Sequence, residues 1–95
     1  MKKKSLPIVK NELSQGVQLL ENGKLREAQE WLRLFIDSNP KHSEALSLLS
    51  KILLLDKKDS EAEKVLLEAE SIDPELPSIY RNQARLLLKK SNPKE

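Results

Sequence analysis

The sequence has no cysteine, a single histidine and only two glycines, and each scarcity excludes a class of protein. Without cysteine there is no disulfide scaffold, no thiol nucleophile and no thiolate ligand for zinc or an iron–sulfur cluster. The lone histidine, His42, leaves no histidine cluster for a metal and no spare general base. The sequence also shows no glycine-rich phosphate loop and no Ser/His/Asp set. We therefore expect a protein that is not an enzyme and that uses no cofactor or metal.

Long apolar runs are missing as well. No stretch approaches the roughly 20 apolar residues of a membrane span. The apolar segment that follows the first lysines, residues 6–9, is shorter than the ~7–15 residues of a signal-peptide core. The formal net charge is +2, which is small for a dedicated nucleic-acid binder. We expect a soluble, cytoplasmic protein that binds neither membrane nor nucleic acid.

Leucine and charged residues dominate what is present. Of the 95 residues 38% are hydrophobic and 34% are charged, but only 3% are aromatic, so the core must be aliphatic. Aromatic and β-branched residues, which strands favour, are few, whereas leucine, glutamate and lysine favour helices. The length suits one small domain. The composition therefore predicts a single all-α domain with a core that continues along the chain.

The charges are distributed unevenly. Residues 1–10 carry four lysines and no acid, and residues 77–95 carry five basic residues and one acid. Because the whole chain is +2, the segment 11–76 between these two +4 ends is −6. Two interpretations stay open: solvated helix faces with basic ends that aid solubility, or a basic strip at one end of a binding surface.

Residues of similar size recur every 34 positions. The turn Asn39-Pro40-Lys41 returns as Asp73-Pro74-Glu75. Small residues recur with the same period, and so do large apolar ones. The matched sets are Gly16, Ser50 and Ala84; Leu19, Leu53 and Leu87; Ala28 and Ala62; Leu32 and Leu66; Phe35 and Ala69. So many matches in one register indicate an internal repeat.

This pattern resembles the tetratricopeptide repeat family, whose 34-residue unit is a pair of antiparallel helices. The first repeat matches the family pattern at Gly16, Leu19, Ala28, Leu32, Phe35 and Pro40. The second matches at Leu46, Leu49, Ser50, Leu53, Ala62, Leu66, Ala69 and Pro74, and a half repeat follows with Tyr80, Ala84 and Leu87. Glu12, Gln15 and Gln83 depart from the pattern, because large apolar residues are usual there. The resemblance implies an α-solenoid of two repeats and a C-terminal capping helix.

The predicted domain spans residues 7–91, between a flexible basic N-terminus, 1–6, and a frayed end, 92–95. Its repeats cover about 9–42 and 43–76, and its five helices lie near 7–22, 25–38, 43–56, 60–72 and 77–91. The last of these is the capping helix. A four-helix bundle is the competing fold, but it requires no 34-residue period.

Individual residues mark the predicted helix ends and crossings. Gly23 suits a left-handed helix end, and Asp59 suits an N-cap. Pro40 and Pro74 close the two repeats, because proline cannot continue a helix. The small residues at 16, 50 and 84 are expected where paired helices cross closely.

The family resemblance implies a protein-interaction module, an adaptor or scaffold that holds a peptide or a partner helix in a concave groove. The expected groove residues are Leu13, Val17 and Leu20; Ser47, Leu48, Lys51 and Leu55; and Arg81, Asn82 and Arg85. This surface is apolar at one end and basic at the other, so an acidic or C-terminal segment with apolar anchors would suit it. The alternative is that Leu48 and Leu55 belong to the core and that the arginines only aid solubility.

One subset of the family grips the C-terminal carboxylates of heat-shock chaperones with Lys, Asn and Arg side chains. The corresponding positions here are Leu13, Val17, Leu48, Ser78 and Asn82, and none of them is basic. The lack of basic residues at these positions argues against a protein that binds the C-terminal segments of heat-shock chaperones. Arg81 and Arg85 lie one helical turn apart and could still hold a carboxylate.

The first predicted helix offers another mode of association. Its apolar strip consists of Val9, Leu13, Gly16, Val17 and Leu20, and a strip without an internal partner often marks an interface. It could hold a ligand helix, be covered by residues 1–8, or pair two copies, so we expect a monomer or a weak homodimer. The alternative function is therefore a homo-oligomerisation or assembly domain cut from a longer protein.

Three residues with ring side chains are expected to have structural roles and not to bind a ligand. Trp31 and Phe35 lie four apart on one helix face and are expected in the core. His42 falls between the repeats and is expected to be a solvated turn residue.

Overall fold

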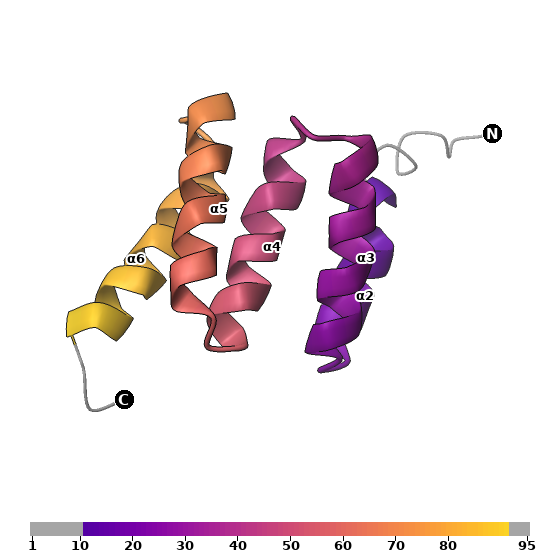
Figure 1. The fold of residues 1–95 in the computed structure, drawn as a ribbon, viewed down its shortest axis with the longest axis horizontal. Coiled ribbons are helices and arrows are strands. Elements are labelled where there is room, and N and C mark those ends of the chain that lie inside the picture. The colour runs from indigo at the N-terminus through magenta and orange to yellow at the C-terminus, as the bar shows by residue number, and fades with distance from the viewer. Residues whose placement is uncertain (1–10, 92–95) are drawn as a thin grey trace.

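The computed structural model describes residues 11–91, which form five α-helices (Figure 1). A short 3₁₀ turn, η1 (Asn11–Leu13), leads into α2 (Ser14–Glu21), and then follow α3 (Leu25–Ser38), α4 (Ser43–Leu55), α5 (Asp59–Ile72) and α6 (Pro77–Ser91). No strand occurs in this part of the chain, so the predicted all-α fold with five helices is confirmed.

The predicted boundaries agree closely with these helices. The bounds of α3 and α6 are those predicted, α4 ends one residue early, and α5 begins one residue early. The segments expected at 1–6 and 92–95, and residues 7–10 of the helix expected over 7–22, lie outside the described residues. Of the rest of that helix, residues 11–13 form the turn η1, and α2 ends one residue early.

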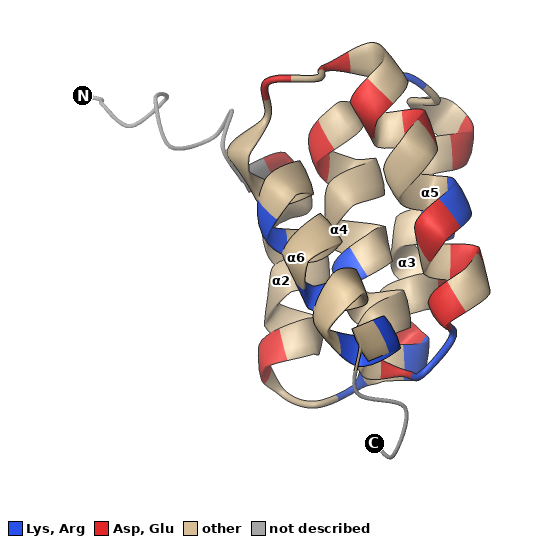
Figure 2. Ribbon diagram, turned by 90° about the vertical axis from the view of Figure 1, so that its left-hand side faces the viewer, with Lys and Arg blue, Asp and Glu red and all other residues tan. Residues whose placement is uncertain are grey.

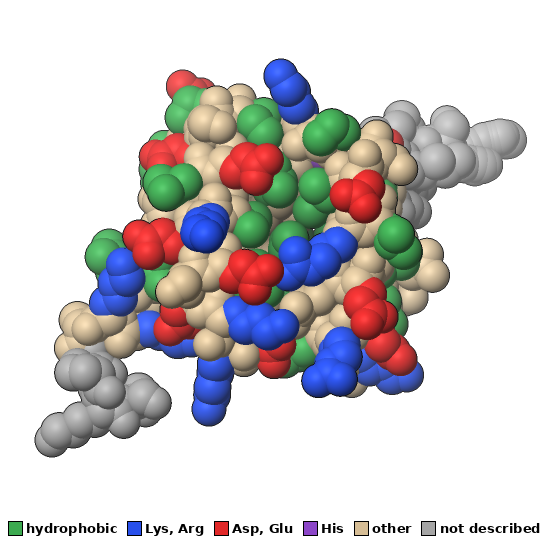
Figure 3. Space-filling view, viewed as in Figure 1, with side chains coloured by type: hydrophobic (Ala, Val, Ile, Leu, Met, Phe, Trp, Pro, Cys, Tyr) green, Lys and Arg blue, Asp and Glu red, His purple; other side chains and the backbone are tan. Residues whose placement is uncertain are grey.

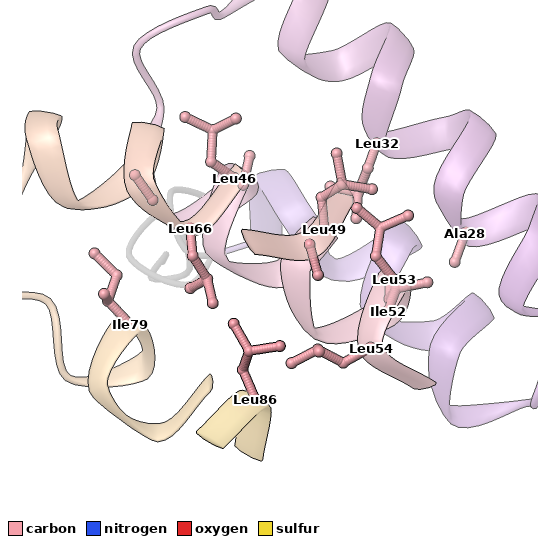
Figure 4. Close-up of a cluster of buried hydrophobic side chains, with 13 residues drawn as sticks. Ala28, Leu32, Leu46, Leu49, Ile52, Leu53, Leu54, Leu66, Ile79 and Leu86 are labelled. Carbon is pink, nitrogen blue, oxygen red and sulfur yellow. The ribbon is translucent and has the colours of Figure 1, made fainter. Parts of the chain in front are cut away.

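Successive helices run in alternating directions, and each contacts the next one along the chain (Figure 1). Helix α4 contacts α3 on one side and both α5 and α6 on the other. Its sequence is apolar around most of its circumference, and six apolar residues are no more than 3% exposed: Ala45, Leu46, Leu49, Ile52, Leu53 and Leu54. A helix with this pattern is stable only when neighbours cover it on several sides. Side chains from α3, α5 and α6 do so (Figure 4).

Trp31 and Phe35 pack against this core from α3, as expected, and their rings stack with centroids 5.5 Å apart. Gly16 of α2 lies under Trp31, and a Cβ atom at Gly16 would come within 2.9 Å of the indole Cε3. Ser50 is fully buried at the equivalent position of α4. Ala84 is exposed, so the expectation of a close crossing there is wrong, because no helix of the described chain covers that face of α6.

The turn after α2 and the turn after α4 have the same backbone geometry. Gly23 has φ 78°, and Lys57, 34 residues later, has φ 65°. In both turns this left-handed residue donates its N–H to a helix carbonyl, Leu20 O at 2.9 Å for Gly23 and Leu54 O at 3.1 Å for Lys57. Glycine adopts this conformation without steric cost, whereas a side chain is strained in it.

We expect Lys57→Gly to raise the free energy of unfolding by about 0.5–1 kcal/mol, because it removes the left-handed strain in the folded state. Gly23→Ala should lower it by about 1 kcal/mol for the converse reason. Urea unfolding followed by circular dichroism measures both changes. A loss of stability in Lys57→Gly would contradict the interpretation of this turn.

The residues at two helix starts differ from expectation. Asp59 is the first residue of α5 and not its N-cap; the cap position is Lys58, whose side chain makes no capping bond. The Asp59 carboxylate instead accepts a hydrogen bond from Lys89 Nζ at 2.8 Å, which ties α5 to α6.

His42, expected to be a solvated turn residue, caps α4. Its Nδ1 accepts from the backbone N–H of Ala45 at 3.2 Å. Because Nδ1 accepts, Nε2 carries the proton and donates to Glu12 Oε1 at 3.1 Å. The imidazole therefore links the start of α4 to η1.

A buried amide joins α3 to the turn after α4. Gln29 is 5% exposed, and its Nε2 donates to Asp56 Oδ2 at 2.8 Å. The same pair of positions, 34 residues later, holds Glu63 and Lys90, and Lys90 Nζ donates to Glu63 Oε1 at 3.2 Å. The hydrogen bond from Gln29 lowers the pKa of Asp56, since it stabilises the charged carboxylate, and the nearby Lys58 ammonium contributes in the same direction.

Because the pKa of Asp56 is lower in the folded state than in the unfolded state, Asp56 stabilises the fold above its unfolded pKa. This contribution is lost as the pH falls through the folded pKa. We expect Gln29→Met to move the pKa of Asp56 up towards the ordinary value of 3.8, and Lys58→Met to move it in the same direction. A carboxyl-carbon NMR titration measures the pKa, and an unchanged value in Gln29→Met would contradict the assigned cause.

Candidate functional site

Six of the predicted groove residues surround one pocket between α4 and α6. The pocket has a volume of ≈ 170 Å³. Its lining consists of Glu44, Ser47, Leu48, Lys51, Ser78, Arg81, Asn82 and Arg85. The sequence analysis missed Glu44 and did not count Ser78 among the groove residues. Both could have been found from helical spacing, because Glu44 lies one turn before Leu48, and Ser78 one turn before Asn82.

The other four predicted residues lie elsewhere. Leu13 and Leu20 are partly buried and pack against the core, and Val17 is also partly buried. Leu55 is half-exposed at the end of α4. None of the four lines the pocket, so its apolar wall is Leu48 alone.

A buried polar network forms the floor of the pocket and joins α6 to α4. Asn82 and Ser47 are 3% and 1% exposed. Asn82 Nδ2 donates to the carbonyl oxygen of Ser47 at 2.9 Å and lies 3.2 Å from Ser47 Oγ. It also lies 3.1 Å from Ser50 Oγ. Ser47 and Asn82 therefore line the pocket, and their buried polar groups also hold the two helices together.

The network extends to both ends of the pocket. Ser47 Oγ and Ser78 Oγ are 2.6 Å apart, within hydrogen-bond distance. Asn82 Oδ1 accepts from Arg85 Nη1 at 3.3 Å, so the same amide that anchors α6 also orients an arginine at the rim. Buried amide and hydroxyl groups are stabilising only when paired in this way.

Basic side chains dominate the rim. Arg81 and Arg85 are exposed one turn apart on α6, and Lys51 is half-buried on α4. Within residues 11–91, none of these three forms an ion pair with a carboxylate. Glu44 is the only acid that lines the pocket, so the lining carries three basic residues against one acid. Such a surplus attracts an anion, and two arginines can hold a carboxylate through several N–H groups.

The remaining basic residues of α6 are used in the fold. Figure 2 shows acidic residues along α5 and basic residues along α6. Lys89 and Lys90 pair with Asp59 and Glu63 of α5, at 2.8 Å and 3.2 Å. The face formed by α3, α4 and α5 carries side chains of both signs in alternation (Figure 3). The unpaired positive charge of α6 therefore lies at the pocket.

Residues 11–91 contain no group of three or more His, Asp or Glu side chains placed to hold a metal ion. No helix in this range is long and apolar enough to cross a membrane. No protein-family model, curated protein or solved structure matches the chain. Function is therefore inferred from the geometry of the pocket.

We expect Asn82→Ala to lower the free energy of unfolding by about 2–3 kcal/mol, because it removes the buried hydrogen bonds that the Asn82 amide makes to Ser47 and Ser50 and opens a small cavity. Arg81→Ala, one residue away but exposed, should change it by less than about 0.5 kcal/mol. Urea unfolding measures both. Equal stability of Asn82→Ala and the unmodified protein would show that the network does not hold α6 to α4.

Proposed function

We propose that the protein is an interaction module, an adaptor and not an enzyme, that binds an acidic segment of a partner protein in the pocket between α4 and α6. The observation that carries the proposal is the group of three basic side chains, Lys51, Arg81 and Arg85, that surround one pocket without an acidic partner in residues 11–91.

The size of the pocket favours a small anionic group over a whole ligand. Its ≈ 170 Å³ is below the ~300–1,000 Å³ that enclose a drug-sized molecule. One carboxylate, from an Asp or Glu side chain or from a chain terminus, fits this space and matches the planar guanidinium groups. Leu48 supplies an apolar wall, so an apolar residue beside the carboxylate would gain further contact.

We also propose that the chain is a solenoid of the tetratricopeptide kind. Three features support this: the left-handed turns at Gly23 and Lys57, the 34-residue offset between them, and the recurrence of the Gln29–Asp56 link as Glu63–Lys90. In such a solenoid the first helix of each pair lines the concave face. Helices α4 and α6 occupy these positions, and the pocket lies between them.

Binding to a panel of labelled peptides tests the proposal. The peptides share one length and one leucine and differ only in whether two, one or no carboxylates lie beside it, and fluorescence anisotropy reports binding to the full chain. We expect the acidic peptides to bind and Arg81→Glu/Arg85→Glu to weaken that binding by about a hundredfold, since each arginine–carboxylate contact contributes on the order of 1.5–3 kcal/mol.

A matched control separates local contact from net charge. Lys41→Glu/Lys64→Glu changes the net charge equally at two exposed positions that do not line the pocket. It should retain most of the affinity. Equal losses in the two double variants, or no loss in Arg81→Glu/Arg85→Glu, would refute binding at this pocket.

A further inference from the structure

Helix α6 presents a row of apolar side chains that the described chain leaves uncovered. Tyr80, Leu87 and Leu88 are 52%, 66% and 68% exposed, and Ala84 is exposed between them. These four residues, here called the α6 strip, share one side of the helix by their spacing. Leu87 also borders an apolar groove of ≈ 220 Å³ between α5 and α6, together with Leu66, Leu67 and Leu86.

The same surface occurs on α4, where it is covered. The residues 34 positions before the α6 strip are Leu46, Ser50, Leu53 and Leu54, and all four are at most 3% exposed. Helix α5 lies along α4 and contributes to covering them. It does so with Ala62 and Leu66, which are themselves 0% and 2% exposed.

A partial copy of the surface occurs on η1 and α2, where the four counterparts are Glu12, Gly16, Leu19 and Leu20. Gly16 is the counterpart of Ser50 and Ala84, and it is covered by Trp31 and Leu32 of α3. In α3 an alanine is followed four residues later by a leucine, as in α5, and both of these residues, Ala28 and Leu32, are fully buried. Each covering helix therefore places a small residue at the crossing and a leucine four residues later. Of the two complete copies of the surface, on α4 and α6, the described chain covers only the one on α4.

We propose that the α6 strip is the docking site for an amphipathic helix of a partner protein, antiparallel to α6 and carrying the Ala-x₃-Leu spacing of α3 and α5. The small side chain of Ala84 allows the two helix backbones to approach closely, as Gly16 does where α3 covers α2. The leucine of the docking helix would enter the groove beside Leu67 and Leu87, as Leu66 enters the core beside α4.

The positive charge of α6 favours a partner protein, and not a second copy of this chain, as the occupant of the α6 strip. Helix α6 carries four basic residues and no acid, so two copies of α6 would bring like charges together. The two helices of this chain that have the required spacing, α3 and α5, already bury it in their own core. An acidic helix fits best, because helical spacing places Arg81 and Arg85 next to Leu88. Helix α5 already meets the other side of α6 with Asp59 and Glu63.

The probe for this site is a synthetic peptide with the sequence of residues 59–72, the acidic helix that covers the equivalent face of α4. A lactam between Lys64 and Ser60→Glu holds it helical, since both positions are exposed on α5. We expect saturable NMR shifts of the Tyr80, Ala84, Leu87 and Leu88 amides when it is added to the ¹⁵N-labelled full chain. A peptide with Leu66→Gln should bind about tenfold more weakly, as expected for the loss of one buried leucine.

Variants of the full chain locate the site. Leu87→Gln/Leu88→Gln should weaken peptide binding by about tenfold or more, since two apolar contacts are lost. Leu34→Gln is the matched control, because Leu34 is 70% exposed on α3 and lies outside the strip. All three leucines are exposed, so circular dichroism should show an unchanged fold in both variants.

Three results would overturn the proposal. The first is the absence of saturable shifts at millimolar peptide. The second is a set of shifts confined to Lys51, Arg81 and Arg85, which would place the peptide in the pocket between α4 and α6. The third is self-association of the chain in sedimentation experiments that Leu87→Gln/Leu88→Gln abolishes, which would make a second copy the occupant. The leucine variants leave the pocket intact, so failure of this proposal is distinguishable from failure of the proposed function.

Discussion

Burial of α4 on several sides is the constraint on which the rest of the structure depends. Its six apolar residues are almost completely covered, and the helices that cover them come from both sides of it in the chain. A domain of this size has little other apolar surface to bury, so stability is concentrated where α3, α5 and α6 meet α4. Helix α2 packs at the edge, with Gly16 beneath Trp31, and the preceding turn η1 is joined to α4 by the contact between Glu12 and His42.

The pocket follows from the same arrangement. Asn82 inserts a polar side chain between two helices, and its bonds to Ser47 and Ser50 leave one relative position for α6. A buried polar network whose groups are paired fixes the relative position of the two helices, because a shift of one helix would leave a buried donor or acceptor unpaired. The rim arginines therefore lie on a rigid support, which would reduce the entropy lost on binding the carboxylate of the proposed ligand.

The sequence predicted the helices well and the roles of polar residues less well. The 34-residue period and the turn residues located the helix ends to within about one residue, because leucine spacing and Gly23 act locally. Ser47 and Asn82 were predicted as groove residues, but the hydrogen bonds between them could not be predicted, because the two residues lie 35 positions apart in the chain and only the fold brings them together. Asp59 was expected to cap α5, but it is the first residue of the helix and its carboxylate accepts from Lys89 of α6, a contact that only the fold creates. Ala84 was expected under a helix that the described chain does not supply.

Native-state hydrogen exchange tests most directly whether α4 supports the whole fold. Amides buried on all sides exchange only through global unfolding, whereas helices covered on one side open locally at lower free energy. We predict that residues 49–54 of α4 exchange at the free energy of global unfolding and that α2 and the C-terminal half of α6 exchange below it. Amides of α2 or α6 that are as strongly protected as those of α4, or an α4 that exchanges before its neighbours, would contradict this account.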